Sequence, residues 1–386
     1  PSGHLANSLL SPILRTMRNK LLIAFSPLVL IAASCGGAAS GDSPPKIQKV
    51  EGQFATEELA TFEEPWAMAV LPDGGVLVTE KAGKLKLRKA DKSIIDIALP
   101  FTVAYGGQGG LGDVIAAPDF AKTGRIYLSW AETGDGDTRG AAVGTGLLKI
   151  EGNSARLEGF AVLWRQNPKV TGRGHYSHRL AVSPDRKWLY IASGDRQKMQ
   201  PAQDPASDLG KIIRLPLVAS GGPGGAPQQF SLGHRNILGM QFAPDGRLWE
   251  IEHGPAGGDE LNLVKQGANY GWPVVSEGRH YGGEFIPHHD TRPDMAAPAL
   301  YWNPVIAPGG MIFYSGKLWP EWKGQLLIAA MNPAGVVRVK IDGDKASEEA
   351  RYPMGKRIRA IAEAGDGSLL VLEDKAGGRL LRLTRK

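Results

Sequence analysis

The sequence predicts an all-β fold, a six-bladed β-propeller, because one short pattern of residues returns six times. Each repeat has an alternating apolar run, a tight turn and a second apolar run. The turns are Pro72-Asp73-Gly74, Pro118-Asp119-Phe120, Pro184-Asp185-Arg186, Pro244-Asp245-Gly246, Pro320-Glu321-Trp322 and Gly365-Asp366-Gly367. Pro and Asp favour such turns, Gly accepts their positive φ, and the flanking alternation is that of half-buried strands.

The spacing of the turns favours a propeller over other repeat folds. Successive turns are 46, 66, 60, 76 and 45 residues apart, a looser period than a solenoid holds. A propeller tolerates long insertions because its loops emerge at the two faces. The composition, with 51 Gly, 27 Pro and 22% charged residues, also favours a turn-rich β fold. A pair of β-sandwiches with coincidental turns is the alternative.

The N-terminal segment predicts an export signal. Met17-Arg18-Asn19-Lys20 is positively charged, and the 13 residues from Leu21 to Ala33 are apolar. Small residues then precede Cys35, the only cysteine. This order is typical of a bacterial signal and resembles a lipoprotein signal, in which Cys35 is acylated. An ordinary export signal with an incidental cysteine is the alternative.

We therefore divide the chain into residues 1–34, an export signal with upstream residues, 35–55, a tether, and 56–386, the propeller. Gly, Ser and Pro are frequent between Ala38 and Lys46, which is typical of a flexible tether. The expected location is the periplasm, with Cys35 as a lipid anchor. With one cysteine, no disulfide within the chain supports the fold.

The charge of the chain argues against a nucleic-acid partner. The formal net charge is +6, and Arg15, Arg18 and Lys20 supply three of these charges within a segment that has no acid. The remainder carries +3, and its basic residues are scattered rather than clustered along one element.

Polar and basic residues recur at nearly the same distance before the turns. These residues are Gln108, His175, Arg235, Asn236, Arg357 and Arg359. In a propeller, equal offsets point towards one central axis, so we expect these side chains to surround the mouth of the channel. Guanidinium groups match carboxylates, and the ring therefore suits a planar, polyanionic ligand. Taken singly, each residue also has a structural interpretation, as a surface charge or a loop cap.

A second group of residues follows the fourth turn. The run from Glu250 to Asn262 is rich in acids and interrupted by Gly254-Pro255, which exposes backbone carbonyls. Free carbonyls beside acids are ligands for calcium. The alternative is a Gly-rich loop whose acids pair with Lys265 or Arg279.

Several motifs in this order resemble the glucose/sorbosone dehydrogenase family of soluble, pyrroloquinoline quinone (PQQ)-dependent aldose sugar dehydrogenases. They are 106–111, 175–180, 193–195, 202–205, 209–212, 233–236, 252–262 and 269–273. The resemblance covers about residues 60 to 385, and the stretch Glu-His-Gly-Pro to Gly-Gly-Asp-Glu-Leu-Asn is highly specific. It implies a six-bladed propeller with PQQ over the channel mouth and calcium beneath it.

The resemblance also implies roles for individual residues. His175 is the expected base for the anomeric hydroxyl of the sugar, and Asp195 orients it. Expected contacts of the cofactor are Gln108, Arg235, Asn236, Arg357 and Arg359, and the expected calcium ligands are the carbonyls of Gly254 and Pro255. The implied partners are an aldose sugar and an external electron acceptor, either a cytochrome, a quinone or a dye.

This chain departs from the family in three places. His178 stands where a small residue is usual, Ile237-Leu238 replaces Pro-Gln, and no lysine occurs near 332–335. Two other functions therefore stay open. One is a non-catalytic binding propeller of the cell envelope, and the other is a calcium-dependent propeller lactonase, whose inward acidic ligands differ from the ring found here.

Overall fold

The computed structural model describes residues 47–218 and 220–386. The predicted signal, Cys35 and most of the predicted tether lie outside the described residues. The predicted boundary at residue 56 falls inside strand β2 (Phe54–Phe62). Two residues of the predicted tether form β1 (Gln48–Lys49), which pairs with β22 (Lys345–Pro353). The folded part therefore begins earlier than the sequence predicts.

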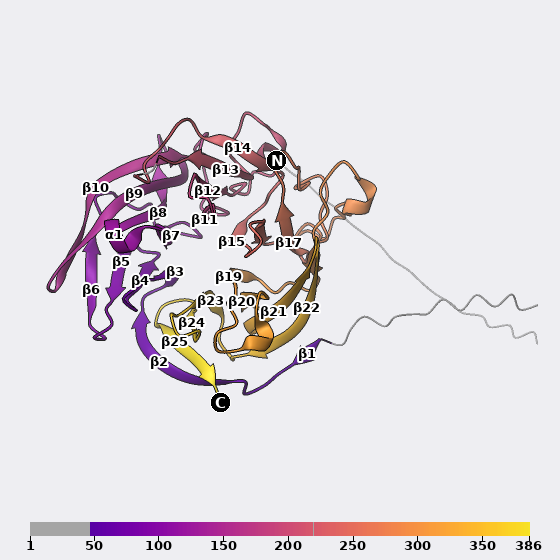
Figure 1. Cartoon of the computed structure of the whole chain (residues 1–386). Coiled ribbons are helices and arrows are strands. Elements are labelled where there is room, and N and C mark those ends of the chain that lie inside the picture. The colour runs from indigo at the N-terminus through magenta and orange to yellow at the C-terminus, as the bar shows by residue number, and fades with distance from the viewer. Residues whose placement is uncertain (1–46, 219) are drawn as a thin grey trace, which may run out of the picture. The chain divides into compact units, whose positions relative to one another are not determined.

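The strands form antiparallel groups of four around a central axis (Figure 1). The first three groups are β3 (Pro65–Val70), β4 (Val76–Glu80), β5 (Lys84–Arg88), β6 (Ile94–Ala98); β7 (Leu111–Ala116), β8 (Arg125–Thr133), β9 (Arg139–Glu151), β10 (Ser154–Arg165); and β11 (Ser177–Val182), β12 (Trp188–Ser193), β13 (Lys211–Pro216), β14 (Gln228–Leu232). A parallel pairing of β6 with β10 joins the first two groups into one eight-stranded sheet.

The remaining groups continue around the same axis. They are β15 (Ile237–Phe242), β16 (Leu248–Glu252), β17 (Asp259–Val264), β18 (Leu300–Trp302); β19 (Pro308–Phe313), β20 (Leu326–Met331), β21 (Ala334–Asp342), β22; and β23 (Ile358–Glu363), β24 (Leu369–Glu373), β25 (Gly378–Arg385) with β2. The described helices are short: α1 (Phe120–Thr123) and the 3₁₀ turns Gln200–Gln203, His289–Thr291 and Pro320–Trp322.

The first strands of the groups close a ring. β3, β7, β11, β15, β19 and β23 each pack against the next, and β23 packs against β3. This closed cycle is the inner wall of a β-propeller, so the predicted fold class is confirmed and the paired sandwiches are excluded. All six predicted turns lie between the first and second strands of their groups. The fifth connection is longer and contains the turn Pro320–Trp322.

The apolar core lies between neighbouring blades rather than at the axis. One cluster joins Leu77 of β4 to Ile126 of β8, and another joins Val76 of β4 to Leu370 of β24. Flat packing of one sheet on the next leaves the inner strand ends free to carry polar side chains. Among the described residues, no helix has the length and hydrophobicity needed to cross a membrane.

The ring closes by pairing the two ends of the described chain. β2, from the N-terminal side, pairs antiparallel with the C-terminal β25, from Phe54 opposite Arg385 to Phe62 opposite Gly378. β23 belongs to this same blade, so the position of the residues at the start of β23 depends on the pairing of β2 with β25.

Candidate active site

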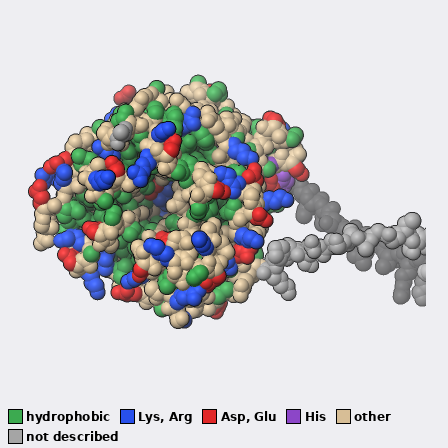
Figure 2. All heavy atoms as spheres, viewed as in Figure 1, with side chains coloured by type: hydrophobic (Ala, Val, Ile, Leu, Met, Phe, Trp, Pro, Cys, Tyr) green, Lys and Arg blue, Asp and Glu red, His purple; other side chains and the backbone are tan. Residues whose placement is uncertain are grey.

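A cavity of about 370 Å³ opens where the inner strands begin. Its wall includes four of the predicted residues, namely Gln108, Asn236, Arg357 and Arg359. They come from three different blades, with Arg357 and Arg359 in the same one, and they meet as the equal offsets from the turns predict. Figure 2 shows one face of the propeller, hollowed at its centre, with charges of both signs scattered over the rest of it. The propeller thus brings distant residues to one polar cavity.

His175 and Asp195 form a buried pair beside this cavity. His175 Nδ1 lies 2.7 Å from Asp195 Oδ1, and the backbone N–H of His175 donates to Gln108 Oε1 at 2.7 Å. The other carboxylate oxygen of Asp195 accepts the indole N–H of Trp272 at 2.8 Å. Burial alone would raise the pKa of Asp195, but these hydrogen bonds hold it below its usual value. The carboxylate therefore fixes the orientation of the imidazole.

The loop before β11 holds His175 in an unusual backbone conformation, with φ of 45°. Arg196 is buried and donates to the carbonyls of Gly174 and Gly172 at 2.8 and 2.6 Å, while its guanidinium lies 3.6 Å from the ring centre of Tyr176. A Cβ on Gly174 would meet Gln197 Oε1 at 2.2 Å, so a larger residue there would displace the Gln197 side chain. The hydrogen bonds of Arg196 thus hold the loop that presents the imidazole.

Arg235 and Asn236 are held through their backbones. Asn236 N–H donates to Glu252 Oε2 at 3.0 Å, and Arg235 N–H donates to the same oxygen. The Arg235 side chain donates to the carbonyl of His253 at 3.0 Å and to the hydroxyl of Tyr281 at 3.2 Å. Its Nε is buried without a partner among the described residues. A guanidinium N–H left unpaired in this way favours an anionic ligand.

Gly254 and Pro255 follow the end of β16 after one residue, His253, so the predicted break of the strand is confirmed. Asp259 accepts hydrogen bonds from the N–H groups of Gly254, Ile306 and Ala307, at 3.0, 2.9 and 2.7 Å. Burial raises the pKa of Asp259 to about 6. Within the described part of the chain, no group donates a hydrogen bond to the carbonyl of Gly254 or Pro255. Both oxygens are therefore available to a ligand.

Arg357 and Arg359 share a counter-ion that the sequence did not reveal. Arg357 Nε and Arg359 Nε each donate to a different oxygen of Asp374 at 2.8 Å. Burial alone would raise the pKa of Asp374, but the two guanidiniums hold it below its usual value. The side chain of Arg357 remains 42% exposed and that of Arg359 14% exposed. Asp374 thus orients both arginines towards the cavity.

His178, which stands where the family usually has a small residue, also borders the cavity. Its ring stacks on Tyr176 at 5.2 Å and meets the edge of Trp66 at 5.8 Å. Neither ring nitrogen has a partner among the described residues, and burial lowers the pKa of His178 to about 3. This imidazole is therefore neutral and packs as an aromatic ring.

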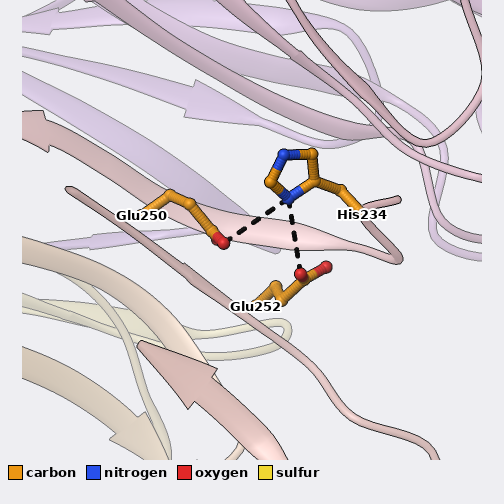
Figure 3. Close-up of side chains that lie close together, drawn as sticks. All are labelled: His234, Glu250 and Glu252. Carbon is orange, nitrogen blue, oxygen red and sulfur yellow. Dashed lines mark ion pairs between the residues drawn. The ribbon is translucent and has the colours of Figure 1, made fainter. Parts of the chain in front are cut away.

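The acids of the run from Glu250 to Asn262 do not pair with Lys265 or Arg279, which corrects that alternative. Lys265 pairs with Asp344 instead. Glu250 and Glu252 point inward towards His234 (Figure 3), with Nδ1 at 3.5 Å from an oxygen of each. Burial raises the pKa of Glu250 to about 7. For His234, burial alone would lower the pKa, but the two carboxylates raise it to about 9.

The sequence missed three other features of the cavity. Lys81 and Lys375 supply cations to its wall, although no lysine stands near 332–335. Met331 also lies on this wall, and its sulfur accepts a hydrogen bond from Arg357 Nη2 at 3.1 Å. Trp272 orients Asp195, and the Asn-Tyr-Gly-Trp-Pro motif was the only signal that could have pointed to it.

Comparisons with known proteins agree with this geometry. The family model for glucose/sorbosone dehydrogenases matches residues 62–382. The aldose sugar dehydrogenase YliI of Escherichia coli is 36% identical over an alignment of 343 residues, and the match covers 84% of this chain and 90% of that protein. The apo structure of soluble aldose sugar dehydrogenase from Escherichia coli has a TM-score of 0.80 and 35% identity, covering 86% of this chain and 100% of the other.

A cofactor-bound structure is also similar. The PQQ-bound form of aldose sugar dehydrogenase from Streptomyces coelicolor has a TM-score of 0.66 and 25% identity, covering 89% of this chain and 100% of the other. The family model spans most of the chain and the identity to a named relative exceeds 30%. This chain belongs to the glucose/sorbosone dehydrogenase family.

Proposed function

We propose that this protein is a PQQ-dependent dehydrogenase that oxidises aldose sugars at the anomeric carbon to lactones. The observation that carries this proposal is the buried His175–Asp195 pair at the edge of a cavity with several cations. A sugar dehydrogenase with bound PQQ is among its structural relatives, which supports the choice of cofactor.

The cavity fits a planar, polyanionic quinone. Its size lies in the range of small-molecule sites. Arg235 has an unpaired buried N–H, and the Arg357–Asp374–Arg359 group presents two further guanidiniums. Arginine forks bind carboxylates through paired hydrogen bonds, so Arg235, Arg357 and Arg359 would hold the carboxylates. Gln108 and Asn236 would add hydrogen bonds to the quinone.

The Gly254–Pro255 turn fits a calcium ion beside that cofactor. Calcium takes oxygen ligands, including backbone carbonyls, in flexible geometry. Both carbonyls lack donors within the described residues, and Asp259 fixes the turn through the N–H of Gly254. A calcium ion held there would polarise a quinone oxygen.

His175 would take the proton of the anomeric hydroxyl. Its Nδ1 faces Asp195, which leaves Nε2 to face the substrate and to act as the base. Asp195 stabilises the imidazolium that forms, because its carboxylate is buried against the ring. PQQ, when bound, accepts the hydride that leaves the sugar carbon. The chain itself therefore supplies orientation and the proton acceptor.

Reconstitution tests this proposal. We expect the protein, freed of quinone and metal, to oxidise aldoses only after both PQQ and calcium are added. Dye reduction with glucose and with other aldoses measures the activity, and calorimetry measures binding of PQQ. Binding without any sugar oxidation would instead support a non-catalytic binding propeller, and hydrolysis of a lactone without PQQ would support a lactonase.

We also propose that the chain is exported and anchored in the envelope through Cys35, and that an external acceptor reoxidises the cofactor. The signal-like segment before Cys35 supports this location. A Cys35→Ser variant should lose lipid labelling and fractionate as a soluble protein. Equal membrane association of both forms would exclude the anchor.

A further inference from the structure

Outside the cofactor cavity, the described chain holds one compact group of metal-ligating side chains, made of His234, Glu250 and Glu252 (Figure 3). His234 lies in the loop between β14 and β15, and the two glutamates alternate along β16 so that both face the same side. One ligand atom from each residue lies within 4.8 Å of the others. His234 and Glu250 are fully buried, and Glu252 is 4% exposed.

The polar atoms of this group are not satisfied by the protein. Among the described residues, His234 Nδ1, Glu250 Oε2 and Asn262 Oδ1 are all buried without a hydrogen-bond partner. Asn262 donates its amide N–H to Glu250 Oε1 at 2.7 Å, so its unpaired oxygen belongs to the same group. Buried polar atoms are paired in nearly all proteins, and several orphans together point to a bound species.

The distances favour a metal ion over a simple ion pair. A protonated imidazole normally donates to a carboxylate at about 2.7–2.9 Å. Here Nδ1 is 3.5 Å from an oxygen of Glu250 and 3.5 Å from an oxygen of Glu252. Ligands at about 2.0–2.2 Å from a tetrahedral zinc ion are separated from one another by about 3.3–3.5 Å. These two distances therefore match those between ligands of a small ion.

The second nitrogen of His234 has the partner that a metal-bound histidine requires. Its Nε2 lies 2.8 Å from Ser231 Oγ, which can accept the ring N–H and leave the Nδ1 lone pair free. The two carboxylates also neutralise the charge of a divalent ion. A buried ion needs this neutralisation because it has lost its contact with water. Imidazole with carboxylate ligands suits zinc and similar ions better than calcium, which prefers oxygen alone.

We propose that His234, Glu250 and Glu252 bind a structural divalent ion of the zinc class, separate from the calcium proposed at Gly254 and Pro255. The remaining oxygen of Glu252 accepts the N–H groups of Arg235 and Asn236. The ion therefore fixes the turn that carries Asn236, which lines the cavity, and Arg235 beside it. This assignment concerns metal content and does not depend on the proposed enzyme activity.

Metal analysis of untagged protein tests the site, because a histidine tag would bind the same ions. The protein is stripped with a chelator, reloaded with Co²⁺ or Zn²⁺ and desalted. Elemental analysis should find one equivalent of bound ion, and cobalt should show the intense visible absorption of tetrahedral coordination. Excess Ca²⁺ should leave the cobalt in place, and its displacement by calcium would overturn the assignment.

Glu250→Gln and His234→Gln should each weaken metal binding by at least about 10- to 100-fold. Glu348→Gln is the matched control, since the side chain of Glu348 is also buried but lies on β22 of the next blade, where it accepts hydrogen bonds from Trp302 and Arg351. It should keep the full equivalent of metal. If His234→Gln does not fold, Glu250→Gln decides alone. No bound ion in the parent protein, or equal metal content in the parent and Glu250→Gln, would refute the site.

Discussion

Two histidines three residues apart, His175 and His178, have opposite surroundings. Both are buried and both have positive φ, 45° and 72°. His175 meets a carboxylate at 2.7 Å, whereas His178 lies between Tyr176 and Trp66 with both nitrogens unpaired. The same side chain is thus a candidate base in one place and an aromatic packing element in the other. The partner, and not the residue type, decides its chemistry.

The most direct test of the difference between the two histidines is to replace each imidazole in turn. His175→Gln should lower turnover by roughly 10²–10⁴-fold, which is the usual contribution of a positioned base. The variant should still bind PQQ, because other residues hold the carboxylates. Steady-state dye reduction at saturating PQQ, calcium and sugar measures the effect.

His178→Gln is the control for that experiment. The ring of His178 has no polar partner, so its loss should reduce turnover far less. A near-normal rate for His175→Gln, or a larger loss for His178→Gln, would show that the base is wrongly assigned.

Variants of Arg357 and Arg359 test whether the residues that bind the cofactor are distinct from those that determine turnover. Each charge-assisted hydrogen bond contributes about 1.5–3 kcal/mol, so Arg357→Ala and Arg359→Ala should weaken PQQ affinity by roughly 10- to 100-fold. Turnover at saturating PQQ should change much less than in His175→Gln. Calorimetric titration measures the affinity, and unchanged values in both variants would contradict the assignment.

The last expected effect is a pH dependence of stability. The pKa of folded His178 is lowered to about 3, below the value of about 6.5 expected in the unfolded chain. Unfolding therefore takes up a proton between these values, so this contribution is complete above about pH 6.5 and is lost as the pH falls. The loss amounts to at most about 1.4 kcal/mol for each pH unit.

His178→Gln should remove that dependence. Between pH 6.5 and 4, the free energy of unfolding should fall less steeply in the variant than in the parent. Denaturant titrations at several pH values measure both slopes. Parallel slopes would mean that His178 is charged or exposed in the folded protein.

Features of the fold that are local and repeated could be predicted from the sequence. The six turns could be located because Pro, Asp and Gly act within four residues, and the offsets from them led to Gln108, Asn236, Arg357 and Arg359 in one cavity. The His175–Asp195 proximity came from a resemblance to a family and agrees with the geometry. The roles of these residues remain predictions.

Partners from distant strands could not be predicted. Trp272 lies 77 positions from the Asp195 that it orients, and Asp374 joins Arg357 and Arg359 from another strand of their blade. No short-range pattern encodes such pairs, because the fold alone brings them together. His178 shows the same limit, since only Trp66 and Tyr176 reveal its apolar surroundings.

The pairing of β2 with β25 has a consequence for how the protein matures. Arg357 lies next to β23 and Arg359 within it, in the blade that this pairing completes, so the cavity is complete only when β25 is paired in this blade. A ligand that binds only the finished cavity stabilises the closed state by mass action. Cofactor binding would then report the assembly of this blade, because chains in which β25 is unpaired would lack the finished cavity and remain exposed to proteolysis.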